Sequence, residues 1–405
     1  MSPVAAAPEA IESNPKDTTR WAAVLAIVGA GIVASLQVGK VIIAAPLLRS
    51  DLGLDLASIG TLTAVFSILG VLGGIAAGGV ISRFGARRML LLGLAATGLG
   101  TVIGALAPGY AVLLASRVVE GLGFLLITVA GPAALQRIVA ARNRDLAFAM
   151  WSCYMPAGMA IAMLASQAFG DWHAYWWCAG AAVVLAFVCV ALLAPASPGG
   201  ASLSWRGLRQ DTADTLGAAG PVLLALSFTL YSLMFFALFT FLPVLLMDQL
   251  GLTLAQAGLY SALASAANII GNLGAGVLLA RGWRRSTLIA CASAIMGVVA
   301  LLIFRSVLPA MPTFLLCVLF SAVGGLIPAT LLGTAPLVSP RPALTAATVG
   351  LVMQGSNLGQ VIGPVTVGGV IDRYGWGAAS YIVLAAGLGG LIIAACLRRV
   401  RAVHL

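Results

Sequence analysis

The sequence has few charged residues and almost no side chains that bind metal. Only 8% of its 405 residues are charged, against about 25% in ordinary soluble domains. A soluble protein of this length needs many charges to cover its surface, so the composition excludes a soluble enzyme, a nucleic-acid-binding protein and a disordered chain. The two histidines, His173 and His404, are too few to assemble a zinc cluster.

Other features are missing as well. None of the six cysteines forms a C-x-x-C pair, and all lie in apolar runs, which predicts buried apolar thiols. Residues 1–20 are polar and contain three prolines, without a cationic segment ahead of a short apolar core. We therefore expect a disordered tail and no cleaved signal peptide. Forty-eight glycines without a G-x-y period exclude collagen and fit close helix packing in lipid.

Hydrophobic residues make up 61% of the chain and gather in long stretches. Stretches of about 20 apolar residues cross a bilayer as helices. We count twelve of them, at residues 21–47, 56–81, 89–107, 110–136, 147–169, 174–195, 220–247, 255–280, 287–307, 312–335, 343–370 and 377–397. This pattern predicts an all-α polytopic membrane protein with twelve transmembrane helices, whose two ends lie on the same side of the membrane.

The basic residues predict the orientation. With a cytoplasmic N-terminus, the inside segments hold seventeen lysines and arginines and the outside segments three, while Lys40 and Arg117 fall within spans. Cytoplasmic loops carry an excess of basic residues, so this bias places both termini in the cytoplasm. The net charge of +10 then reports orientation in a plasma (inner) membrane and not a nucleic-acid partner.

The chain divides into two similar halves. Residues 52–60 (LGLDLASIG) and 250–258 (LGLTLAQAG) match at six of nine positions, at an offset of 198. Duplicated helical halves with a binding site at their midplane interface are typical of secondary transporters. We expect five segments: a cytoplasmic tail 1–20, a six-helix bundle 21–195, a cytoplasmic linker 196–219, a six-helix bundle 220–397 and a tail 398–405.

The loop after span two contains a short motif of glycines and arginines: Gly78, Ser82, Arg83, Gly85, Arg87 and Arg88. This motif resembles the signature G-x-x-x-D-R-x-G-x-R-R of the major facilitator superfamily, and the resemblance extends over residues 21–397. Span four carries Arg117, Glu120, Gly121 and Gly123, which resemble the family's R-x-x-Q-G-x-G pattern. The resemblance implies two pseudo-symmetric six-helix halves, transport by alternating access, no cofactor, and a gating role for the loop after span two.

Two positions depart from the family pattern. Ser82 stands where the family has an aspartate that is implicated in contacts between the halves, so the loop lacks that charge. Span five has only Pro156 and Gly158 in place of the G-P-x-x-G-G pattern of drug/proton antiporters, whereas span eleven has Gly363 and Pro364 within a glycine-rich run. These spans are more similar to the cyanate/nitroimidazole-type and organic-anion branches.

Three ionisable residues lie inside the predicted spans, where burial of charge is expensive. At 1.5 Å per residue, Lys40 and Arg117 sit roughly 10 Å below the outer surface, and Glu120 is one turn deeper. We interpret Lys40 as a cationic anchor for an anionic substrate, with Gln37 one turn away; the alternative is a lysine that reaches the interface. Glu120 is either a proton carrier beside Arg117 or half of a structural i,i+3 ion pair.

Neutral polar residues form a second set of candidate substrate-binding side chains. Gln354, Asn357 and Gln360 recur every three positions in span eleven. The other candidates in this set are Tyr154, Tyr231 and Asn268. These side chains either orient a substrate by hydrogen bonds or bond to neighbouring helices.

Two further patterns concern packing. Gly70, Gly74 and Gly78 fall on one stripe of span two, which predicts close helix packing. The aromatic residues of the outer loop are interpreted as interfacial anchors; they are Trp172, Tyr175, Trp176 and Trp177.

The leading hypothesis is a secondary active transporter, proton-coupled and monomeric, that imports a small organic or inorganic anion as a symporter. The alternatives are efflux of drugs, metabolites or siderophores, and a transporter-like substrate sensor. A nucleotide-driven pump is excluded because the sequence has no G-x-x-x-x-G-K-[ST] loop. A membrane enzyme is disfavoured because no Ser/His/Asp set or metal cluster is present.

Overall fold

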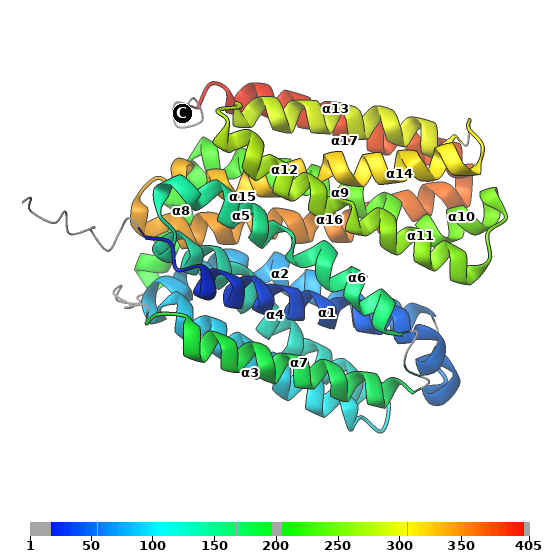
Figure 1. Ribbon diagram of the computed structural model, residues 1–405, viewed down its shortest axis with the longest axis horizontal. Helices are drawn as coiled ribbons and strands as arrows, with labels where there is room; N and C mark the ends of the chain where they lie inside the picture. The colour runs from blue at the N-terminus through cyan, green and yellow to red at the C-terminus, as the bar shows by residue number, and fades with distance from the viewer. Residues whose placement is uncertain are drawn as a thin grey trace, which may run out of the picture.

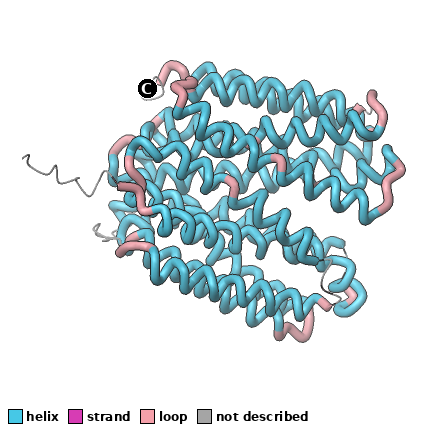
Figure 2. Tube along the Cα trace, in the orientation of Figure 1, coloured by secondary structure: helices cyan, strands magenta, loops and turns pink. Residues whose placement is uncertain are grey.

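The computed structural model describes residues 18–54, 56–166, 169, 171–196, 205–305 and 307–400. These residues form helices joined by short connections, and no strand occurs among them (Figure 2). The disordered tail predicted at 1–20 and the tail predicted at 398–405 fall largely on residues 1–17 and 401–405, which lie outside the described residues.

The N-terminal half is built from seven α-helices and one short 3-10 helix. In chain order they are α1 (Trp21–Leu52), α2 (Leu56–Phe84), α3 (Ala86–Ala105), α4 (Tyr110–Ile138), η2 (Ala141–Asn143), α5 (Arg144–Ser152), α6 (Tyr154–Ser166) and α7 (Trp172–Leu193). Helix α1 continues five residues beyond the predicted end of span one at residue 47. A left-handed Gly53, with φ of 63°, ends it.

A linker helix and the C-terminal half follow. They comprise α8 (Trp205–Gly217), α9 (Ala219–Phe239), α10 (Leu242–Leu250), α11 (Leu254–Ala266), α12 (Asn268–Ala280), α13 (Arg285–Phe304), α14 (Ala310–Gly324), α15 (Leu326–Val338), η3 (Pro342–Leu344), α16 (Thr345–Tyr374) and α17 (Trp376–Leu397). Figure 1 shows the two halves lying side by side, and the described chain begins and ends at the same end of the bundle.

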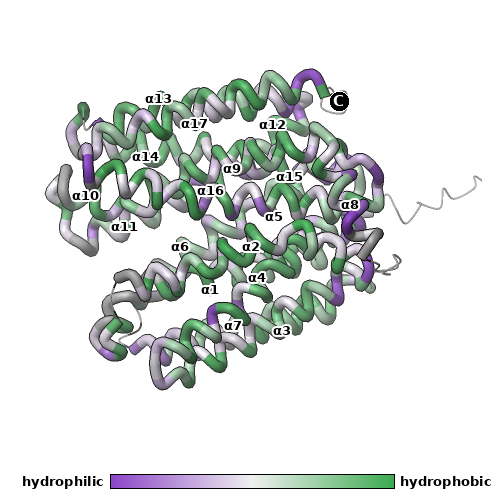
Figure 3. The backbone as a smooth tube through the Cα atoms, turned by 180° about the vertical axis from the view of Figure 1, so that it is seen from behind, coloured by the Kyte–Doolittle hydropathy of each residue, from purple (hydrophilic) through white to green (hydrophobic). Residues whose placement is uncertain are grey.

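The predicted spans coincide with these helices, singly or in pairs. Ten helical segments of the described chain are long and apolar enough to cross a membrane. Span five is divided into α5 and α6, which are too short singly, and span eleven is the 30-residue α16, whose three amides and many glycines lower its hydropathy. Hydrophilic segments gather at the two ends of the bundle (Figure 3). The protein is therefore an all-α polytopic bundle.

Prolines explain three of the four breaks within spans. Pro156, Pro243 and Pro328 each lie four residues after the last residue of the preceding helix, namely α5, α9 and α14. A proline has no N–H to donate to the carbonyl four residues earlier, so the helix is interrupted there. The fourth break, between α11 and α12, has no proline; there the backbone of Asn268 packs directly against Gly325. Other prolines lie inside helices that continue past them, among them Pro132, Pro336 and Pro364.

The repeat has a structural counterpart. Gly251 ends α10 in the left-handed conformation with φ of 64°, as Gly53 ends α1, and the two glycines are 198 residues apart. A side chain with a Cβ would be strained at both positions. The linker between the halves is partly helical, which was not predicted from the sequence. Its helix α8 is amphipathic, and Asp211 and Asp214 of this helix pair with Arg341 of the C-terminal half.

The glycine stripe of α2 packs closely against another helix, as predicted, and that helix is α16. A Cβ at Gly78 would meet the carbonyl of Ala346, one at Gly74 would lie 2.6 Å from the carbonyl oxygen of Gly350, and one at Gly70 would meet the Asn357 side chain. Small residues allow such close backbone approach. This α2–α16 seam joins the two halves towards the end of the bundle that carries the chain ends.

The interpretation of the outer-loop aromatic residues as interfacial anchors is wrong for three of the four. Trp172, Tyr175 and Trp176 are buried in a core with the ends of α1 and α4, and only Trp177 is exposed. Their helical spacing turns one face of α7 inward, and Trp172 Nε1 donates a 2.7 Å hydrogen bond to Asp51. The cysteine prediction is also only partly right, since Cys178, Cys291 and Cys396 are exposed on the bundle surface.

Candidate functional site

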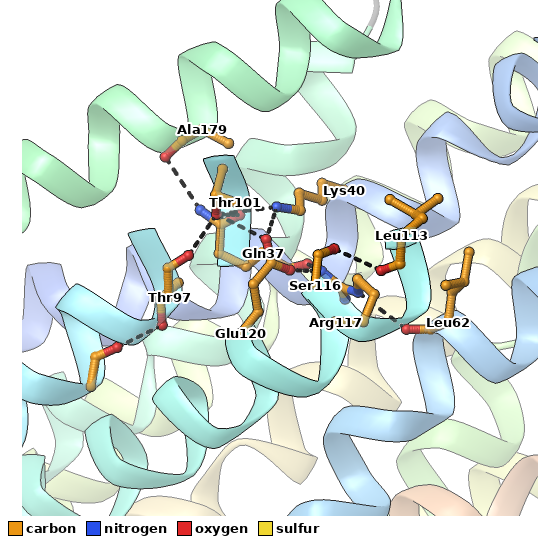
Figure 4. Close-up of polar contacts among 11 residues, drawn as sticks. Gln37, Lys40, Leu62, Thr97, Thr101, Leu113, Ser116, Arg117, Glu120 and Ala179 are labelled. Atoms are coloured by element: carbon orange, nitrogen blue, oxygen red, sulfur yellow. Dashed lines mark hydrogen bonds and ion pairs between the residues drawn. The ribbon is translucent and has the colours of Figure 1, made fainter. Parts of the chain in front are cut away.

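The three ionisable side chains predicted inside spans contact one another (Figure 4). Lys40 comes from α1, and Arg117 and Glu120 come from successive turns of α4; all three side chains are 0% exposed. Lys40 Nζ lies 2.5 Å from Glu120 Oε1, while Arg117 Nη1 pairs with Glu120 Oε2. We call Lys40, Arg117 and Glu120 the ion cluster.

Neutral groups from neighbouring helices complete the ion cluster. The Thr101 hydroxyl of α3 lies 2.9 Å from Glu120 Oε1. Arg117 donates to two backbone carbonyls, from Nη1 to Gln37 at 2.9 Å and from Nε to Leu62 at 3.2 Å. Lys40 Nζ lies 4.7 Å from the ring centroid of Trp176 on α7. The cluster is thus held by α1, α2, α3, α4 and α7, all in the N-terminal half.

The electrostatics of this arrangement are unusual. Two basic side chains and one acidic side chain share a site that solvent does not reach. A buried ion pair is stable only when hydrogen bonds satisfy most of its remaining polar atoms. Most are satisfied here, but Arg117 Nη2 is buried with no hydrogen-bond partner among the described residues. An ion pair between Arg117 and Glu120 within α4 would already be neutral without a lysine. Because Lys40 also binds Glu120, the cluster is more than the i,i+3 pair predicted from spacing.

A separate cavity lies between the two halves. Its free volume is about 50 Å³, room for only a few waters. It is lined by side chains of both halves that carry no charge, among them Tyr154, Met155, Phe228, Tyr231, Phe235, Asn268, Ser356 and Gln360. Four of the neutral polar candidates therefore line it: Tyr154, Tyr231, Asn268 and Gln360. Lys40, Gln37 and Arg117 do not line it. Their side chains contact α3, α7 and α2, respectively.

Hydrogen bonds fix the polar wall of this cavity. Asn268 Nδ2 donates to Tyr231 Oη at 3.1 Å and to the Ser321 carbonyl at 2.9 Å. Asn272 Nδ2 in turn donates to Asn268 Oδ1 at 2.7 Å. Asn268 is the first residue of α12, directly after the break that follows α11. The break thus positions an amide and a phenol at the interface, with aromatic and methionine side chains around them.

The remaining amides lie in the α2–α16 seam. Gln354 Nε2 donates to the Val71 carbonyl of α2 at 2.5 Å, and Asn357 Nδ2 donates to Met353 of its own helix. Gln354 Oε1 and Asn357 Oδ1 are buried without a partner among the described residues. Gln360 differs, because it lines the cavity and accepts from the Ser67 hydroxyl across the interface at 3.2 Å.

Two hydrogen bonds of the loop after α2 stay within the N-terminal half. Ser82 donates to the Gly78 carbonyl one turn earlier, and Arg87 donates to the Ala191 carbonyl of α7 at 2.6 Å. Gly85 has φ of 87°, which favours glycine at this turn. The ion pair between the halves lies elsewhere: Arg285 of α13 bonds Asp145 of α5 at 2.8 Å.

Several of these groups were not identified from the sequence. Thr101 and Trp176 contact the ion cluster, and Met155 and Phe235 line the cavity. Thr101 gave no signal because one hydroxyl in an apolar run is ordinary, and Trp176 was interpreted as an interfacial anchor. Asp145 did give a signal, since it is an acidic residue among three loop arginines at the start of span five.

Fold and site together define a polytopic membrane transport protein with two packed helical halves. A sequence profile described as Major Facilitator Superfamily matches residues 27–348. The chain belongs to this superfamily, as the motifs in spans two and four implied. It is similar in fold to the human organic anion transporter MFSD10 (TETRAN), with a TM-score of 0.78 and 16% identity over 93% of this chain and 100% of that one.

Curated relatives match parts of the chain. The uncharacterised MFS-type transporter Rv1250 of Mycobacterium tuberculosis is 26% identical over 44% of this chain and 31% of its own length. The puromycin resistance protein pur8 of Streptomyces alboniger is 29% identical over 40% of this chain and 32% of its own. A probable 4-methylmuconolactone transporter of Cupriavidus pinatubonensis is 29% identical over 31% of this chain and 30% of its own. The matched part spans about a third of each relative.

Proposed function

We propose that this protein is a proton-coupled secondary transporter that holds its coupling proton and its cargo at different places. The observation that carries the proposal is the fully buried ion cluster, which lies apart from an uncharged cavity between the halves. Ionisable groups inside a membrane protein are retained chiefly for function, because their burial is costly. Alternating access moves the halves about the cavity, and a change of protonation in the cluster biases that motion.

The first candidate cargo is a small organic or inorganic anion. The ion cluster carries a net positive charge when its three members are ionised, and charge in a low-dielectric interior acts over a long range. This potential favours an anion over a cation in the neighbouring cavity. The fold similarity to a protein named an organic anion transporter supports the same choice.

The second candidate is export of an uncharged or amphiphilic molecule. The cavity lining supports it, because Met155, Met159 and Phe235 offer adaptable apolar contacts without a charged side chain to anchor an anion. A relative named for puromycin resistance points the same way. Tyr231 and Asn268 then supply the few hydrogen bonds that orient such a cargo.

The orientation is part of the proposal. The excess of basic residues at one end supports a cytoplasmic location of both chain ends in a plasma membrane. The halves are then packed together on the cytoplasmic side in this conformation, at the α2–α16 seam and at the pair between Asp145 and Arg285. We propose a monomer as the working unit, since both halves of the cavity come from one chain.

Transport by purified protein in liposomes tests the proposal. We expect an imposed pH gradient to drive uptake of one of two probes: benzenesulfonate, which stays ionised, or puromycin. A protonophore should abolish that uptake. It should leave intact the exchange of probe between the two sides of the membrane when the probe concentrations on both sides are equal. Gradient-driven uptake of benzenesulfonate supports the first cargo class, and that of puromycin supports the second. Transport that is insensitive to pH gradient and protonophore contradicts the coupling.

A further inference from the structure

The charges of the ion cluster do not balance. Lys40 and Arg117 supply two positive charges and Glu120 one negative charge, and all three side chains are fully buried. With every member ionised, the site holds one uncompensated positive charge away from water. Such a charge is expensive in a low-dielectric interior, and a protein relieves it by a change of protonation.

The groups that face Lys40 from each packed helix do not supply the missing negative charge. Its own helix contributes the Gln37 amide, α3 contributes Thr101, and α7 contributes the ring of Trp176. Helix α4 contributes Arg117 and Glu120. No other charged side chain is paired with the cluster in the part of the chain that the structure describes, so the cluster relieves its charge only through its own members.

Only one of the three members relieves that charge by exchanging a proton. A proton on Glu120 would raise the net charge from one to two, and the guanidinium of Arg117 stays protonated in proteins. Loss of a proton from Lys40 leaves a neutral pair between Arg117 and Glu120. We infer that Lys40 carries the exchangeable proton of the ion cluster and that Glu120 remains a carboxylate throughout. The exchange is the loss of one proton from the Nζ ammonium, which becomes a neutral amine.

The contacts of Lys40 suit both of its forms. The ammonium donates to Glu120 Oε1 at 2.5 Å and lies over the Trp176 ring, which favours a cation. The neutral amine can keep a hydrogen bond to Glu120 and accept one from the Thr101 hydroxyl, 3.4 Å away. Arg117 holds Glu120 Oε2 in either form. In either form Lys40 and Glu120 therefore keep their hydrogen bond, so the proton is exchanged without breaking the contacts of the ion cluster.

The inference revises the expectation that Glu120 is the proton carrier. It rests on the proposed proton coupling for its role in transport, but the identity of the protonated group is a separate matter. In this scheme Glu120 is the fixed anion that holds Lys40 in place. Removing the charge of Lys40 changes how strongly α1 is bound to α4, so protonation alters packing inside the N-terminal half.

Infrared difference spectra of the full-length protein in lipid, recorded across a pH titration, test the assignment directly. We expect wild type to show loss of a lysine ammonium signal that is absent from Lys40→Met. We also expect wild type to show no protonated-carboxyl signal from Glu120, so Glu120→Gln should remove no such signal from the spectrum. A carboxyl signal lost in Glu120→Gln would overturn the inference, and so would a titration in which neither group changes its protonation. This measurement needs no cargo.

Transport by two Lys40 variants provides the second test. Lys40→Arg fixes a positive charge at this position and Lys40→Met fixes a neutral one, so both should lose pH-driven uptake of the benzenesulfonate or puromycin that wild type accumulates. A cooperative thermal unfolding transition in detergent shows that both variants fold. Retained pH-driven uptake by Lys40→Arg would place the proton on Glu120 instead. If wild type itself shows no pH-driven uptake, the proposed function fails while the spectra still decide where the proton lies.

Discussion

Arg117 makes several contacts in the ion cluster that depend on the shape of its guanidinium group and not only on its positive charge. Its guanidinium binds the Glu120 carboxylate and also reaches the carbonyls of Gln37 and Leu62, which belong to two other helices. It lies 4.1 Å from the ring centroid of Phe66 as well. A lysine at this position would carry the same charge but could not reach these groups together, because it lacks the planar fork of donors.

Arg117→Lys should therefore destabilise the protein although the net charge is unchanged. A hydrogen bond to a charged group contributes ~1.5–3 kcal/mol, and at least one is lost. Thermal unfolding in detergent measures the effect against Arg373→Lys, an exposed arginine with no hydrogen bond or ion pair in the described part of the chain. Equal melting temperatures for the two variants would show that the backbone contacts of Arg117 contribute nothing.

The sequence indicated the members of the ion cluster but not its geometry. Lys40, Arg117 and Glu120 stand out because ionisable residues inside spans are rare. Depth along a helix could be estimated from residue counts, and the three residues placed at similar depths do lie together. The direction in which each side chain points depends on how the helices rotate and pack, which spacing within one helix does not determine. For that reason the sequence could not separate the ion cluster from the cavity.

At the scale of elements, glycines and prolines determine where helices touch and where they break. The α2–α16 seam depends on side chains no larger than hydrogen at Gly74 and Gly350, whose backbones meet across the interface. The stripe on α2 was readable from its period of four residues. Its partner helix was not, because a small-residue stripe specifies close approach without specifying which helix approaches.

Gly74→Leu should force the seam apart. The added side chain would meet the Gly350 carbonyl and Gln354, and overpacking of this kind costs about 1–3 kcal/mol. We expect spin labels on the ends of α2 and α16 near the chain ends to move apart. Gly60→Leu is a matched control on the same helix, since nothing lies within 4 Å of a Cβ at Gly60. A seam that keeps its wild-type distance in Gly74→Leu would contradict this account of the contact.

At the scale of the whole molecule, the two halves are joined by a charge pair away from the loop that the family signature marks. Ser82 bonds within its own helix, whereas Asp145 and Arg285 connect α5 to α13 across the interface. Arg285 Nε and Nη1 have no other partner among the described residues, so this arginine depends on Asp145. The internal repeat predicted two halves, but the pairing of two residues 140 positions apart required the structure.

Asp145→Asn should weaken the contact between the halves at this end. It leaves a largely buried arginine without its anion, a loss of about 1–3 kcal/mol for a partly exposed pair. Increased labelling of a cysteine introduced beside the α2–α16 seam would report the opening. The charge exchange Asp145→Arg with Arg285→Asp should restore the wild-type labelling rate. If the single variant labels at the wild-type rate, the pair does not hold the halves together.

The central claim, that the ion cluster couples protons to transport, is tested most directly by pH-driven uptake in liposomes containing Glu120→Gln. One pH unit is worth ~1.4 kcal/mol per proton, so it supports about tenfold accumulation by wild type for each coupled proton. We predict that Glu120→Gln equilibrates the probe without accumulating it and still exchanges it, whereas the exposed control Asp171→Asn accumulates it as wild type does. Wild-type accumulation by Glu120→Gln would contradict the account.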